Sequence, residues 1–148
     1  MGHLGGTKSI EVEAPIEACW ALAADVASAP EWQSGLEGMK VLDTDDQGRP
    51  TKCETSSDIK VRVVKTIVRF TYQEPSRVSW SQEKGDLKSL DGAWELEDLG
   101  DGRTKVTYTL DGDPGRVLGM LLRGPVEGKV RDVMVNGRPG EFKARVEA

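Results

Sequence analysis

The sequence is poor in histidine and cysteine, the side chains on which many enzymes and metal sites depend. Its one histidine, His3, lies in a glycine-flanked N-terminal segment, and the two cysteines, Cys19 and Cys53, lie far apart. A Ser-His or Cys-His nucleophile pair inside the domain is therefore excluded in its usual form, as is a zinc site of clustered Cys and His. We expect no metal and no cofactor, and we interpret both thiols as small buried apolar groups.

Several other signals are also absent. No run approaches the roughly 20 apolar residues of a membrane span, and Met1–Gly6 lacks the basic and apolar regions of a secretory signal. The aspartates lack EF-hand spacing, and the glycines never form GxGxxG after a strand. A net charge of −5 opposes attraction to nucleic acid or an anionic membrane. We expect a cytoplasmic protein, monomer or homodimer, with no membrane span and no nucleic-acid partner.

What the sequence does contain favours one thin-walled domain. Its 148 residues fit a single domain over residues 7–148, after a flexible N-terminus over residues 1–6. Hydrophobic residues make up only 37%, whereas 17 glycines and 30% charged residues are high values. This composition predicts a sheet with many turns and a partly hollow interior.

The first 35 residues predict a strand followed by two short helical segments. Apolar and polar residues alternate from Lys8 to Glu13, as in a strand with one buried face. Pro15 then opens an amphipathic helix that Ala29-Pro30 stops, and residues 31–33 make one further turn before Gly35.

Six more segments predict strands, with turns every eight to twelve residues or so. Aspartate and glycine at residues 45–49 and 100–102 suit hairpin connections between antiparallel strands. The expected strands lie around Met39–Asp43, Thr51–Thr55, Lys60–Tyr72, Val78–Gln82, Leu90–Leu96 and Val106–Leu110.

The sequence pattern of the C-terminal quarter predicts helix. Apolar residues recur at three- and four-residue steps from Pro125 onward, which predicts a long amphipathic helix, with a kink or break near Asn136–Gly140. Before it, the apolar patch Val117–Leu122 is interpreted as packing at the helix entry. A lid hinged at Gly119 is the alternative.

The order of these elements resembles the polyketide cyclase/dehydrase and lipid-transport family of the START-like (SRPBCC, helix-grip) superfamily. The resemblance rests on APIEACWALAADVASAPEWQ near the N-terminus and VSWSQEKGDLKSLDGAWELEDLGDGRTKVTYTL in the middle. It implies an α+β helix-grip fold, a seven-stranded antiparallel sheet wrapped around a long C-terminal helix, with two short helices between strands 1 and 2. It also implies a cavity for sterols, phospholipids, polyketides, quinones or hormone-sized ligands. The run Gly137-Arg138-Pro139-Gly140 departs from the family's uninterrupted helix and predicts an altered cavity roof.

Aromatic residues mark the expected cavity wall. By strand parity Trp80, Trp94 and Tyr108 point to the same concave face, where flat apolar walls suit a planar ligand. Core packing against the terminal helix is the alternative role. The predicted ligand-binding residues are Trp32, Phe70, Tyr72, Trp80, Leu90, Trp94, Tyr108, Val130 and Met134.

Polar groups inside that wall would orient a ligand. Parity selects Thr55, Arg62, Thr66 and Gln82, and a bulge would add Arg69 and Asp91, although most of these are expected to be solvated. An arginine buried there needs a carboxylate or a ligand oxygen, because an unpaired buried charge is costly. Tyr72, Asp91, Tyr108 and Arg69 are the candidates for any catalytic role.

Three functions fit this reading. The first is a carrier or sequestering protein for a small hydrophobic ligand, with no reaction catalysed. The second is a polyketide aromatase/cyclase using the same cavity, which predicts a buried ionisable group beside the aromatics. The third is a protein-interaction module docking through Val117–Leu122, which predicts a closed, side-chain-filled interior and a large apolar patch outside.

Overall fold

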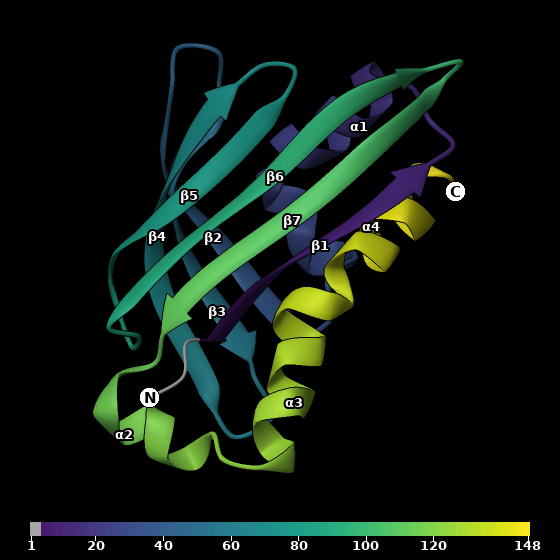
Figure 1. Cartoon of the computed structure of the whole chain (residues 1–148). Helices are drawn as coiled ribbons and strands as arrows, with labels where there is room; N and C mark the ends of the chain where they lie inside the picture. The colour runs from purple at the N-terminus through teal and green to yellow at the C-terminus, as the bar shows by residue number, and fades with distance from the viewer. Residues whose placement is uncertain (1–3) are drawn as a thin grey trace.

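A single antiparallel sheet forms most of the protein. The computed structural model describes residues 4–148, and its seven strands follow the order β1-β7-β6-β5-β4-β3-β2. Figure 1 shows the sheet with the C-terminal helices lying along its β1 side. This arrangement confirms the predicted α+β helix-grip fold. The strands are β1 (Leu4–Val12), β2 (Leu36–Thr44), β3 (Pro50–Asp58), β4 (Val63–Gln73), β5 (Arg77–Gly85), β6 (Ser89–Gly100) and β7 (Arg103–Asp113).

Strand β1 begins within the segment expected to be flexible. Leu4 is buried and pairs with Gly112 of β7, so residues 4–6 belong to the sheet. The glycines there permit close strand contact, since a Cβ on Gly5 would lie 2.4 Å from the carbonyl oxygen of Leu110. Residues 1–3, including His3, lie outside the described part of the chain.

Two short helices follow β1, as predicted. Helix α1 (Ile16–Ala24) ends before the predicted stop at Ala29-Pro30, and η1 (Val26–Glu31) is a 3-10 helix that contains Pro30. Cys19 and Trp20 of α1 are buried in the main core. Together these helices close one end of the concave face and place Trp32 at its edge.

The C-terminal segment contains the predicted interruption. Helix α3 (Pro125–Arg131) continues into the π-helical turn η2 (Asp132–Asn136), and α4 (Arg138–Val146) begins directly after Gly137. Pro139 lies in the first turn of α4, where its missing N–H costs no hydrogen bond. The wider π turn also changes which residues face the sheet, and Arg138, two residues after it, is buried.

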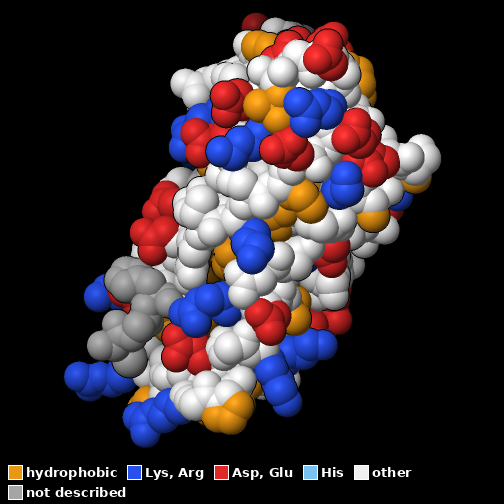
Figure 2. Space-filling view, turned by 45° about the vertical axis from the view of Figure 1, so that its right-hand side comes forward, with side chains coloured by type: hydrophobic (Ala, Val, Ile, Leu, Met, Phe, Trp, Pro, Cys, Tyr) orange, Lys and Arg blue, Asp and Glu red, His pale blue; other side chains and the backbone are white. Residues whose placement is uncertain are grey.

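Helix α2 (Gly115–Leu121) carries the apolar patch noted in the sequence. Leu118 and Leu122 are buried in a second core cluster, as expected for packing, whereas Val117, Met120 and Leu121 are exposed. Figure 2 shows basic and hydrophobic side chains at the lower end of the molecule, where Figure 1 places α2. Elsewhere on this face acidic and basic side chains are interspersed.

Candidate ligand cavity

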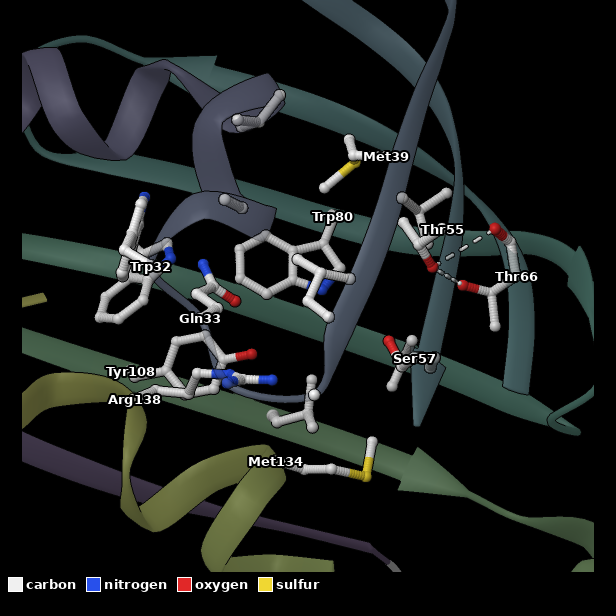
Figure 3. A pocket seen from close by; sticks show the side chains of 18 of the residues that line it. Trp32, Gln33, Met39, Thr55, Ser57, Thr66, Trp80, Tyr108, Met134 and Arg138 are labelled. Atoms are coloured by element: carbon white, nitrogen blue, oxygen red, sulfur yellow. Dashed lines mark hydrogen bonds between the residues drawn. The ribbon is translucent and has the colours of Figure 1, made fainter. Parts of the chain in front are cut away.

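A cavity of about 100 Å³ lies between the concave face of the sheet and the helical segments that cover it. Its walls come from the end of α1, from η1, from inner-face residues of strands β2 to β7, and from the C-terminal segment around Met134. Figure 3 shows side chains from these elements converging on one space. The expected unfilled room beneath the C-terminal helices is therefore present.

Aromatic rings form one wall of this cavity. Ring centroids lie 4.5 Å apart for Trp94 and Tyr108 and 5.8 Å apart for Trp80 and Tyr108, which confirms that these three residues share a face. Trp32, the residue after η1, has its ring centroid 6.0 Å from that of Trp94. Such tilted aromatic contacts contribute roughly 0.5–1.5 kcal/mol each beyond burial, so the wall is a preformed surface.

A glycine positions one of these rings. Trp80 pairs with Gly92 on the neighbouring strand, and its indole lies over the glycine backbone. A Cβ at residue 92 would lie only 2.4 Å from Cε2 of Trp80. The indole can therefore lie flat against β6 only because residue 92 has no side chain.

Arg138 supplies a buried positive charge at one end of the cavity. The residue is 5% exposed, and it is the one cation among the cavity-lining residues within the described chain. Its Nη1 donates to the carbonyl oxygen of Ser34 at 2.7 Å and to Oε1 of Glu141 at 3.0 Å. Its Nε is buried and has no hydrogen-bond partner within residues 4–148.

Tyr108 lies beside this guanidinium (Figure 3). Burial raises the pKa of the Tyr108 hydroxyl above its usual range, and the Arg138 charge lowers the pKa by a smaller amount. The phenol therefore stays protonated at neutral pH and keeps its O–H donor. A buried ionisable group does stand beside the aromatics, as the cyclase hypothesis requires.

Hydroxyl groups line the opposite side of the cavity. The Oγ1 atoms of Thr55 and Thr66 are 2.7 Å apart across β3 and β4, and Ser57 lies nearby in Figure 3. The parity argument for Thr55 and Thr66 is confirmed. Because the two threonines already bond each other, they offer a ligand only their remaining hydrogen-bonding capacity.

Seven of the nine predicted ligand-binding residues line the cavity, and their contact with a ligand stays a prediction. Tyr72 does not line it, because its Oη donates to the carbonyl oxygen of Pro50 at 2.5 Å. Val130 is fully buried in the second core cluster instead. The seven are Trp32, Phe70, Trp80, Leu90, Trp94, Tyr108 and Met134.

The other polar candidates lie outside the cavity, and three of them are solvated, as was expected for most of this group. Arg69 has a 61% exposed side chain that pairs with Glu83, and Asp91 and Arg62 are also exposed. The β4–β5 bulge does not turn Arg69 inward, since it falls between Ile67 and Val68. Gln82 is directed to the carbonyl oxygen of Leu87, to which its Nε2 donates at 2.9 Å.

Sequence reasoning missed Arg138 and Gln33 as cavity-lining residues. Gln33 follows η1 and points into the cavity between Trp32 and Trp80 in Figure 3. The one available signal for Arg138 was the Gly-Arg-Pro-Gly run itself, which places an arginine where helical periodicity is interrupted. That run predicted a break but not the face that the arginine would occupy.

Within residues 4–148, no group of three or more His, Cys, Asp or Glu side chains is placed to hold a metal ion. No helix in that range is long and apolar enough to cross a membrane. Cys19 and Cys53 are free and buried, which confirms their interpretation as small apolar groups. Burial raises the pKa of the Cys53 thiol to about 11, so it is protonated at neutral pH.

Fold, cavity and sequence pattern together identify the family. The chain belongs to the polyketide cyclase / dehydrase and lipid transport family, whose sequence pattern matches residues 12–137. This match confirms the resemblance noted in the sequence.

Solved structures share the fold over nearly the whole chain. A START superfamily protein from Mycobacterium smegmatis superposes with a TM-score of 0.82 at 22% identity, covering 99% of this chain and 98% of that one. The Zhui aromatase/cyclase from Streptomyces sp. R1128 gives a TM-score of 0.78 at 17% identity, covering 99% and 94%. At these identities the likeness shows the fold alone.

One curated relative is the uncharacterized protein PA1579 of Pseudomonas aeruginosa. It is 27% identical, and the match covers 71% of this chain and 58% of that protein. The chain thus spans little more than half the length of this relative.

Proposed function

We propose that the protein binds a small hydrophobic ligand in this cavity and acts as its carrier or sequestering protein. The observation that supports this proposal best is a preformed aromatic wall facing unfilled space, rather than a core closed by its own side chains. Burial of apolar ligand surface contributes about 25 cal/mol per Å², and the few polar groups at the two ends would orient the ligand.

The size of the cavity favours a ring-sized ligand. Its volume of about 100 Å³ is well below the roughly 300–1,000 Å³ typical of sites for drug-sized molecules. A single-ring compound, or one end of a longer molecule, matches this space better than an extended polyketide chain does.

Filling the cavity with a larger side chain tests the proposal. We expect Met134→Trp to fold but to lose at least about tenfold in affinity for small apolar ligands, because the new indole occupies their space. Three of the four tryptophans line the cavity, so intrinsic fluorescence reports binding, and native mass spectrometry reports ligands retained from lysate. Leu42→Trp, on an exposed strand position, is the control. Equal binding by wild type and Met134→Trp would contradict the proposal.

A second candidate is catalysis of the aromatase/cyclase type. Arg138 and the protonated Tyr108 hydroxyl favour it, because they are buried polar groups that would stabilise an enolate next to a flat wall. Incubation with a synthetic poly-β-keto thioester separates the two functions. A carrier leaves the profile of spontaneous products unchanged, whereas a cyclase produces a cyclised product that disappears in Tyr108→Phe.

A further inference from the structure

The Arg138 end of the cavity offers hydrogen-bond donors. A guanidinium has five N–H donors and no acceptor, and the hydrogen bonds that Arg138 donates to Ser34 and Glu141 both come from Nη1. Nε is buried and has no hydrogen-bond partner among residues 4–148. Because buried donors are normally satisfied, the guanidinium keeps unused donor capacity at this end of the cavity.

The neighbouring groups strengthen this donor character. The Tyr108 hydroxyl lies beside the guanidinium and is kept protonated by burial. The carboxylate of Glu141 is engaged on both oxygens, by Arg138 and by the backbone N–H of Ser34 at 2.8 Å. Glu141 therefore balances part of the positive charge without supplying an acceptor for Nε.

We infer that the ligand carries an oxyanion, a carboxylate or an enolate or phenolate oxygen, which binds the Arg138 guanidinium and the Tyr108 hydroxyl. The apolar body of the ligand then lies against Trp80 and Trp94. This inference rests on the proposed function, since it assigns the chemistry of one end of a ligand in the same cavity. Arg138 is thus a specificity-determining residue.

If Arg138 had a purely structural role, its substitution would have a different effect from the one that oxyanion recognition predicts. Its bonds to Ser34 and Glu141 tie the start of α4 to the connection between η1 and β2. If that were its whole contribution, loss of the guanidinium would lower stability and weaken all ligands alike. Recognition of an oxyanion instead changes the ratio between matched anionic and neutral ligands.

The experiment compares 4-ethylbenzoate, 4-ethylbenzamide and protonated 4-ethylbenzylamine at pH 7 by tryptophan fluorescence and calorimetry. These probes have nearly the same shape and differ in charge. We expect wild type to bind the benzoate about tenfold to a hundredfold more tightly than the amide, and the amine most weakly, because hydrogen bonds to charged groups are the stronger ones.

Four variants test whether Arg138 and Tyr108 cause the preference for benzoate over amide. Arg138→Gln should abolish the benzoate-to-amide preference with the amide affinity within about threefold of wild type, and Arg138→Lys should keep part of it. Tyr108→Phe, which removes one oxygen atom, should reduce the preference several-fold and remains informative if Arg138→Gln fails to fold. Arg145→Gln is the matched control, since Arg145 lies on the same helix but pairs outside with Glu31.

An unchanged benzoate-to-amide ratio in Arg138→Gln, or in Tyr108→Phe if the former does not fold, would overturn the inference while leaving the proposed function intact. A wild type that prefers the amine would do the same. If none of the three probes bound, the inference would be overturned too. The proposed function would be contradicted separately, by equal retention of apolar ligands from lysate in wild type and Met134→Trp.

Discussion

At the scale of single residues, the shape of the cavity depends on the absence of a side chain at Gly92. The indole of Trp80 lies over Gly92, where any side chain would occupy its place. The ring of Trp80 then approaches Phe70 on one side and Tyr108 on the other, at centroid distances of 6.0 Å and 5.8 Å. One glycine therefore sets the position of the central ring in the wall.

Gly92→Ala should displace that ring. The methyl group would lie within 3 Å of three indole atoms, so we expect Trp80 to move into the cavity and ligand affinity to fall about tenfold or more. Stability should fall by about 1–3 kcal/mol, measured by urea unfolding. Gly38→Ala in β2 is the control, because a Cβ there has no neighbour within 4 Å. Unaltered intrinsic fluorescence and ligand affinity in Gly92→Ala would refute this role.

At the scale of elements, the C-terminal segment determines the polar chemistry of the cavity. The π-helical turn Asp132–Asn136 separates two short α-helices and is followed by Arg138 facing inward. Two hydrogen bonds between the Ser34 backbone and α4, one from Arg138 and one to Glu141, hold that helix against the η1–β2 connection. The same contacts place the negative charge of Glu141 close to the inferred anion site.

Glu141→Gln should therefore raise affinity for an anion. Removing this charge leaves Arg138 less neutralised, and we expect 4-ethylbenzoate to bind roughly threefold to tenfold more tightly, with 4-ethylbenzamide unaffected. Titration calorimetry on both probes measures the effect. Glu31→Gln, which breaks the outer pair with Arg145, should change neither affinity. A parallel loss for both probes in Glu141→Gln would mean that Glu141 acts only as a structural tie.

Elements differ in how well their sequence predicts them. The strands could be predicted because alternation has a period of two and each turn carries Gly, Asp or Pro, so Trp80, Trp94 and Tyr108 were assigned correctly to one face. Strand β4 starts at Val63 rather than Lys60, which adopts a φ of 81° in the preceding turn. Arg138 could not be assigned because helical periodicity assumes 3.6 residues per turn, and a π turn breaks that count.

At the scale of the whole molecule, sheet and helices together form a container. The main core continues from α1 across the sheet to Phe142 of α4, and the cavity lies within this cluster rather than on the outer surface. The second core, which includes Ile59 and Leu118, closes the end next to α2. The interaction-module hypothesis required a filled interior as well as an apolar patch outside. Val117, Met120 and Leu121 are exposed, but the cavity argues against the hypothesis.

The most direct test of this account is the position of a bound ligand in a crystal of the protein with 4-iodobenzoate, located by the anomalous signal of iodine. We predict one dominant peak inside the cavity, with the ring against Trp80 and the carboxylate directed to Arg138 and Tyr108. Iodine found only on the outer surface, at a concentration that saturates binding in solution, would contradict the claim that this cavity is the ligand site.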